Sequence, residues 1–255
     1  MLPDFRIWLN HFEYHAQHPR RVPEGLFDVL TPEEHDRISR SIATFQLGEQ
    51  SDGTHLRMAA RRFAHVNSIP DLDRIVELFV REEGRHAELL KEFMLDHGMP
   101  LKQRDWTDVL FRSIRKMAGF EVYLHVLIAA ELVGNVYYRA LESVTGCQRL
   151  RILCRTLVAD ELAHVGFESE LVRAVWARKP TVLRGLLRTC HKAFYAATCS
   201  VVWLTHRTVL QTAGYRMTSF VRSCLLQYAF HLESPLPRRT IHSANAATNP
   251  RECGH

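Results

Sequence analysis

Two short segments decide the fold of this chain: EEGRH at residues 82–86 and DELAH at residues 160–164. Each contains the pattern Glu-x-x-His directly after an acidic residue. Because residues three positions apart share one face of an α-helix, each pattern presents a carboxylate and an imidazole on the same side. Each pattern also interrupts a stripe of apolar residues with the helical period of 3.6 residues. We therefore predict that both segments place metal-ligand side chains on buried helix faces.

Two single glutamates, Glu49 and Glu131, interrupt apolar stripes in the same manner. Glu49 precedes Glu83 by 34 residues, and Glu131 precedes Glu161 by 30 residues. Since a helix rises about 1.5 Å per residue, two long antiparallel helices joined by a short loop can return such residues to one level. Burying four carboxylates without compensation is very costly, and metal cations are the natural compensation. Two Glu-x-x-His motifs with two single glutamates form the ligand set of a carboxylate-bridged di-metal site in a four-helix bundle.

The hydrophobic periodicity predicts an all-α chain with four long helices and two appended ones. Thr31, Pro32 and Glu34 form a capping-box start for the first long helix, which is expected to run to about Asn67. The other predicted helices cover about 70–97, 107–145 with Gly119 as a division or kink, 148–179, 181–213 and 217–233. The predicted organisation is an N-terminal arm at 1–30, one helical domain at 31–234 with its core bundle at 31–179 and appended helices at 181–234, and a disordered tail at 235–255.

The composition excludes several classes of protein. A hydrophobic fraction of 46% excludes a disordered chain, and 12 Gly with 10 Pro exclude collagen-like material. The chain carries 33 Lys or Arg against 28 Asp or Glu, for a net charge of +5. The basic residues are scattered rather than grouped, so there is no strong signal for nucleic-acid binding.

The cysteines and the apolar runs indicate the compartment. None of the six cysteines forms a Cys-x-x-Cys pair, which argues against a zinc ribbon, a rubredoxin module or a thioredoxin-type centre. No secretory signal is visible at the N-terminus. The most apolar run, Ala193 to Thr205, is shorter than the roughly 20 residues that span a bilayer, so we expect a buried or membrane-surface helix and no transmembrane span. A cytoplasmic location is predicted.

These motifs resemble those of the ferritin-like di-iron carboxylate superfamily, which includes rubrerythrins, soluble desaturases, ribonucleotide reductase small subunits and related oxygenases. The resemblance rests on GEQSDG at 48–53, AEL at 130–132 and the two Glu-x-x-His segments, and it covers about residues 32–178. It implies a ferritin-like four-helix bundle with six metal ligands that are also the catalytic centre. In this arrangement Glu83 and Glu161 bridge the two metals, Glu49 pairs with His86, and Glu131 pairs with His164.

The residues beside the motifs are predicted to support the ligands. In the family, an acid such as Asp160 or Glu82 accepts the second N–H of a ligand histidine, which fixes the tautomer and raises the ligand's basicity. Arg85 would complete the charge network with these acids. An exposed i,i+3 ion pair is the alternative interpretation of Glu82 and Arg85.

The ligand types indicate the chemistry. Carboxylate and imidazole ligands suit iron and manganese. The resemblance implies two Fe ions, with Mn/Fe or Mn as alternatives, in a non-haem oxygenase or oxidase that activates O2 or peroxide. The substrate is expected to be a small or carrier-bound organic molecule in an apolar cavity beside the site. No electron-transfer module is recognisable, so we expect an external reductase or ferredoxin as donor.

Other functions fit the same motifs. A non-catalytic iron-binding or ferroxidase-type protein would share the ligand set. A tRNA-modifying hydroxylase would share it too, but the sequence contains no cluster of basic and aromatic residues that would support RNA binding. A scaffold with a dead site is the third alternative, which the presence of all six ligands disfavours. Either a lid or the surface of a homodimer is predicted for the stretch Trp203 to Arg207, the pair Gly214 and Tyr215, and the last helix.

Overall fold

The computed structural model describes residues 5–23, 29–50, 53–106, 113 and 119–234, and the regular secondary structure in these ranges is entirely helical. The all-α prediction is therefore confirmed, whereas the predicted tail at 235–255 and most of the segment 107–118 lie outside the described residues. The helices are α1 (Arg6–Gln17), α2 (Pro32–Glu49), α3 (Thr54–Asn67), α4 (Leu72–Asp96), α6 (Phe120–Ser143), α7 (Gln148–Ala177), α8 (Thr181–Thr212) and α9 (Met217–Tyr228), followed by a π-helical turn at Ala229–Glu233.

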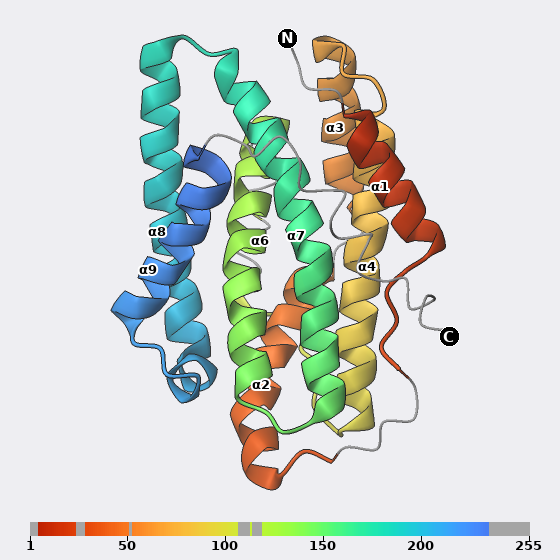
Figure 1. The fold of residues 1–255 in the computed structure, drawn as a ribbon, viewed down its shortest axis with the longest axis vertical. Coiled ribbons are helices and arrows are strands. Elements are labelled where there is room, and N and C mark those ends of the chain that lie inside the picture. The colour runs from red at the N-terminus through yellow and green to blue at the C-terminus, as the bar shows by residue number, and fades with distance from the viewer. Residues whose placement is uncertain (1–4, 24–28, 51–52, 107–112, 114–118, 235–255) are drawn as a thin grey trace, which may run out of the picture.

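Two helix pairs form the centre of the structure: α2 packs against α4, and α6 packs against α7. Contacts between α4 and α7 join the pairs, and these helices run along the long axis of the molecule (Figure 1). Helix α1, inside the predicted N-terminal arm, packs against α4 on one side. Helices α8 and α9 lie on the other side, where both contact α6 and α8 also contacts α2. The centre is thus covered from two sides.

The start of α2 shows the predicted capping box. The Thr31 hydroxyl accepts from the Glu34 N–H at 3.2 Å, and the Glu34 carboxylate accepts from the Thr31 N–H at 3.0 Å. The other Glu34 oxygen accepts from the Gly146 N–H at 2.6 Å. This carboxylate therefore begins α2 and also holds the loop between α6 and α7 beside it.

The helix predicted to run from residue 31 to about Asn67 is two helices, so that prediction was wrong. Helix α2 ends at Glu49 and α3 begins at Thr54. Gly53 lies between them with a φ of 62°, a left-handed conformation that glycine adopts without steric cost. The break places Glu49 at the C-terminal end of α2 rather than in mid-helix.

Helix α6 is the most apolar of the described helices. Within the described residues it alone has the length and composition of a membrane-spanning helix, with a mean hydropathy of 1.2 over its apolar window. In the structure 72% of that window is buried, as it is in the core helix of a soluble protein. The predicted absence of a membrane span stays a prediction.

The turn at Gly53 yields a first testable prediction. A Cβ atom at Gly53 would lie 2.2 Å from Val80 Cγ1, whereas a Cβ atom at Gly98, which has a φ of 66°, would meet nothing within 4 Å. Gly98→Ala should lower the free energy of unfolding by the left-handed strain alone, about 1–2 kcal/mol. Gly53→Ala should cost about 1–3 kcal/mol more because α4 must shift. Urea denaturation measures both variants, and equal losses would contradict this account of the turn.

Candidate metal centre

The two Glu-x-x-His motifs meet at the contact between α4 and α7. The imidazoles of His86 and His164 are fully buried, with ring centroids 5.5 Å apart. His86 Nδ1 lies 3.1 Å from Glu161 Oε1, and His164 Nδ1 lies 2.8 Å from Glu83 Oε1 and 3.1 Å from Glu161 Oε2. The donor atoms of these four residues all lie within 4.8 Å of one another, a grouping that could hold a metal ion.

Both histidines turn their Nε2 atoms away from this cluster, toward a second acid. His86 Nε2 lies 3.2 Å from Asp160 Oδ2, and His164 Nε2 lies 3.2 Å from Glu82 Oε2. The arrangement is reciprocal, because Asp160 of α7 holds the histidine of α4 and Glu82 of α4 holds the histidine of α7. An outer acid that accepts the Nε2 proton leaves Nδ1 free as a ligand atom.

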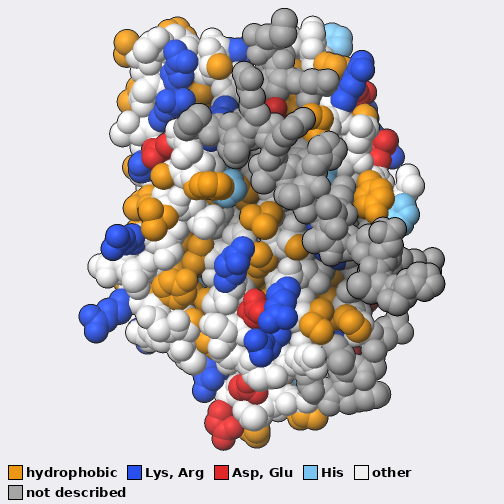
Figure 2. Space-filling view, in the orientation of Figure 1, with side chains coloured by type: hydrophobic (Ala, Val, Ile, Leu, Met, Phe, Trp, Pro, Cys, Tyr) orange, Lys and Arg blue, Asp and Glu red, His pale blue; other side chains and the backbone are white. Residues whose placement is uncertain are grey.

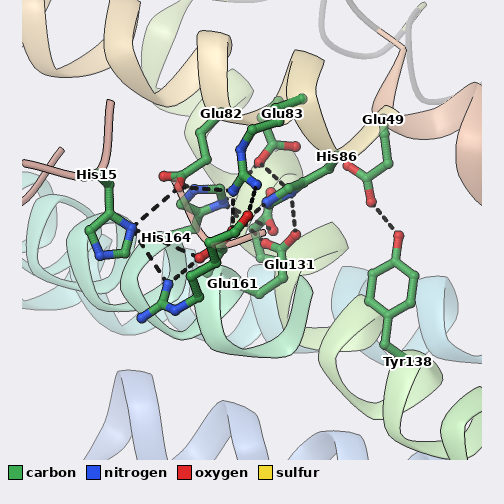
Figure 3. Close-up of polar contacts among 12 residues, drawn as sticks. His15, Glu49, Glu82, Glu83, His86, Glu131, Tyr138, Glu161 and His164 are labelled. Atoms are coloured by element: carbon green, nitrogen blue, oxygen red, sulfur yellow. Dashed lines mark hydrogen bonds and ion pairs between the residues drawn. The ribbon is translucent and has the colours of Figure 1, made fainter. Parts of the chain in front are cut away.

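The two single glutamates flank the cluster (Figure 3). Glu131 of α6 is buried, and its Oε2 atom lies 4.0 Å from His164 Nδ1. Glu49, at the end of α2, accepts a hydrogen bond of 2.6 Å from the Tyr138 hydroxyl. The structure thus places all six sequence-predicted ligands around one region, with four of them in direct proximity and Glu49 turned toward Tyr138.

Three buried polar atoms at the centre, Glu83 Oε1, His86 Nδ1 and Glu161 Oε1, lie in ion pairs but make no aligned hydrogen bond with the described residues. Buried polar atoms without a hydrogen bond are rare and costly in folded proteins. Here they belong to three neighbouring ligand-type side chains, and oxygen and imidazole nitrogen are donor atoms that iron and manganese accept. The donor set therefore fits a bound cation.

The pKa values of the carboxyl groups also indicate that the site lacks positive charge when no metal is bound. Burial and the charges of Glu83 and Glu161 raise the pKa of Glu49 well above its ordinary value. Burial and the charges of Glu161 and Glu83 also raise the pKa of Glu131. In the absence of a cation, these two carboxyl groups therefore hold their protons to higher pH than an ordinary glutamate does.

The pKa values of the two histidines are raised as well, which favours their positively charged form. Burial alone would lower the pKa of His86, but the hydrogen bond with Asp160 and the charge of Glu161 raise it to about 10. Burial is likewise outweighed at His164, where the charges of Glu161 and Glu83 raise the pKa well above its ordinary value. Two imidazolium charges thus take the place of cation charge in the metal-free protein.

A second group of ligand-type atoms, from His15, Glu82 and Asp160, also lies within 4.8 Å. Arg20 and Arg85 both form ion pairs with Asp160, which is fully buried. Although burial opposes it, the hydrogen bond with His86 and the Arg20 charge lower the pKa of Asp160. Guanidinium groups already supply the positive charge here, so this group does not require a metal.

The structure shows whether Glu82 and Arg85 form an exposed ion pair. Glu82 is buried, with 8% of its surface exposed, and Arg85 Nη2 lies 3.5 Å from its Oε1 atom. The alternative of an ordinary exposed pair is therefore wrong for this residue.

The N-terminal arm contributes residues that the sequence analysis missed. His15 Nδ1 lies 3.4 Å from Glu82 Oε1, and the ring of Phe12 stacks on His164 with centroids 5.8 Å apart. Arg20 follows α1 and reaches Asp160. The spacing of Phe12 and His15 on one face of α1 marks a buried stripe, but no local pattern reveals what that stripe covers.

Glu168 was also missed, although its position in the sequence offered a signal. Glu161, His164 and Glu168 share one face of α7 through their spacings of three and seven residues. Glu168 is 1% exposed, its Oε2 atom makes no hydrogen bond with any residue that the structure describes, and burial raises its pKa well above the ordinary value. Glu168 lies one turn beyond the Glu-x-x-His motif of α7.

A cavity of about 150 Å3 adjoins the centre on the side of α8. Glu49, Glu83, Glu131 and Glu161 line one part of it. The remaining wall is mostly apolar, with polar atoms from threonine and histidine, and it is formed by Thr44, Phe45, Gly48, Val126, Leu127, Ala130, Val133, Gly134, Tyr138, Thr198, Val201, Val202, Thr205 and His206.

Comparisons of the chain with protein-family models, with curated proteins and with solved structures found no match.

The pKa shifts predict how the stability of the metal-free protein depends on pH. Folding raises the pKa values of Glu49, Glu131, His86 and His164, so above about pH 7.5 the folded chain binds more protons than the unfolded chain. Its free energy of unfolding should therefore fall as pH rises from about 7.5 toward 9. Carboxylates with lowered pKa values act oppositely, and so do five histidines whose pKa burial lowers, but these contributions are complete above about pH 7.5 and are lost on acidification; the histidines are His11, His125, His191, His206 and His231.

Urea denaturation of the chelator-treated protein across this pH range measures the slope. Glu131→Gln removes one of the groups whose pKa is raised, so the slope should become shallower in this variant. Saturating metal should flatten the slope in the wild-type chain, because cations replace the bound protons. A stability that rises with pH in the metal-free protein would contradict the assignment of these charges.

Proposed function

We propose that this chain is a carboxylate-bridged di-iron oxidoreductase with a ferritin-like four-helix bundle formed by α2, α4, α6 and α7. Its reaction would be the activation of O2 or peroxide to oxidise or oxygenate a small or carrier-bound organic substrate, with electrons from an external donor. The observation that carries the proposal is the reciprocal arrangement of the two Glu-x-x-His motifs, each with Nδ1 turned inward and Nε2 held by an acid of the other helix.

The charges of the site support a pair of cations. Four carboxylates from Glu49, Glu83, Glu131 and Glu161 balance the charge of two divalent ions. Mixed carboxylate and imidazole ligands suit iron and manganese, and no cysteine lines the cavity that adjoins the site. We name iron, with manganese or a mixed pair as alternatives. When bound, the metal pair would supply the binding of O2 and the electron transfer.

The chain's own groups would orient the ligands and shape the reaction space. Asp160 and Glu82 fix the inward orientation of both imidazoles, and Tyr138 holds one oxygen of Glu49 through its hydroxyl proton. Thr198, Val202 and Thr205 of α8 form one wall of the cavity beside the carboxylates. Its volume of about 150 Å3 favours a compact, mainly apolar substrate or the apolar end of a larger one.

Iron loading tests the proposal. The purified full chain, loaded with Fe(II) under anaerobic conditions and freed of excess metal, should retain about two irons per chain. Glu83→Ala and Glu161→Ala should each abolish or strongly reduce retention. Glu88→Ala, an exposed glutamate on α4, is the matched control and should retain iron as the wild type does.

Rapid mixing of the iron-loaded chain with O2 should then give a transient visible absorption band. Iron retention that is unchanged in Glu83→Ala and Glu161→Ala would refute the metal site. Turnover of Fe(II) and O2 that yields no organic product across a substrate screen would instead assign a ferroxidase-type function.

The cavity is tested separately from the metal. Apolar cavities of this order of volume bind xenon, so xenon NMR of the metal-free chain should detect an occupied site. Val202→Trp, on the α8 wall, should fill the cavity and abolish that signal without affecting iron retention. Thr208→Trp, exposed on the same helix, should leave it intact. Xenon binding that survives Val202→Trp would place the binding site elsewhere.

A further inference from the structure

The C-terminal third of the described chain has an unusual charge pattern. From Leu171 to Leu232 there is no Asp or Glu, although nine residues are Lys or Arg. Lys179 and Lys192 are paired with Glu121 and Glu233, which lie outside this stretch. The basic residues are Arg173, Arg178, Lys179, Arg184, Arg188, Lys192, Arg207, Arg216 and Arg222.

Helix α8 presents an uncharged stripe to solvent. Val182, Leu186, Ala193, Ala197 and Leu204 recur at spacings of four and seven residues, so they share one face of the helix. All five are exposed, with Val182 at 87%, Leu186 at 59% and Leu204 at 64%. The solvent face of a surface helix is normally polar or charged. This stripe instead carries no charged residue.

Helix α9 extends the same surface. An open groove of about 510 Å3 is lined by Ser200 of α8 and mainly apolar residues of α9, among them Met217 and Leu226. Phe230 follows Leu226 by one turn and is 61% exposed. We name this surface the α8–α9 face: the stripe Val182, Leu186, Ala193, Ala197 and Leu204 with Ser200, Met217, Val221, Leu225, Leu226 and Phe230. Part of it is visible over α8 and α9 in Figure 2.

Arginines border the face, and the part of the chain that the structure describes gives them no carboxylate partner. Arg222 lines the groove, Arg207 follows Leu204 by one turn, and Arg216 precedes Met217. All three are exposed, and none forms an ion pair within the described residues. An apolar surface bordered by unpaired cations complements the interface of an anionic bilayer, where acyl chains accept the apolar side chains and headgroups attract the arginines.

We propose that the α8–α9 face docks this protein on the surface of an anionic phospholipid bilayer. A second copy of the chain fits less well, because joining two such faces would bring together two sets of arginines without any acidic residue. Nucleic acid fits less well too, because the exposed side chains are mainly aliphatic rather than stacking aromatics. The proposal is independent of the function of the metal centre.

Vesicle sedimentation of the purified full chain tests this. The wild type should sediment with vesicles of equimolar phosphatidylcholine and phosphatidylglycerol, and much less with phosphatidylcholine alone. The double variant Leu204→Glu/Leu226→Glu should lose binding, because it places carboxylates on the apolar face. Arg207→Gln/Arg222→Gln should weaken binding by about fivefold for each arginine.

The matched control is Met58→Glu/Val66→Glu on α3, a helix that also carries exposed apolar side chains, arginines and no acidic residue. This variant should bind vesicles as the wild type does, and circular dichroism should show equal helicity in all variants. Absence of wild-type binding, or an equal loss in the α3 variant, would overturn the proposal. If the wild type is a dimer that dissociates in the Leu204→Glu/Leu226→Glu variant, the face binds a second copy of the chain and the bilayer proposal is wrong. If the protein binds soluble polyglutamate but not vesicles, the face binds an acidic protein instead.

Discussion

The structure depends on the burial of carboxylates at a point where four helices approach one another. Each buried carboxylate would cost several kcal/mol if it were ionised and unpaired. The chain therefore surrounds this point with imidazoles, and it places the outer acids against guanidinium groups. The positions of the helices are constrained by this requirement in addition to apolar packing, because a shift of one turn would leave a charge without its partner.

The reciprocal bonds between α4 and α7 connect the two helix pairs. Each helix supplies both an inward ligand and the outer acid that orients the other helix's histidine. Neither motif can therefore be positioned alone. Arg20 adds a third segment to the same network, so the arm that follows α1 is held by the electrostatics of the centre.

The sequence allowed the central helices and the inward-facing motifs to be predicted, since helical periodicity and the Glu-x-x-His spacing are local properties. The break between α2 and α3 was not predicted because Leu56 and Ala60 stay in phase with the preceding stripe, so that periodicity alone conceals Gly53. The role of α1 could not be predicted, because Phe12 and His15 reach partners 67 or more residues away and no local pattern encodes which helix covers which. Glu168 could have been found by extending the ligand face by one turn.

Helix α8 has two faces with different neighbours. Thr198, Val202 and Thr205 line the cavity beside the carboxylates, while Ala197 and Leu204 of the same turns face outward. The backbone of one helical turn carries side chains to both faces, although α8 is kinked at His206. An outer neighbour that displaced these turns and thereby changed the inner volume would couple the two surfaces, and occupancy of the cavity would then change the outer affinity by the same factor.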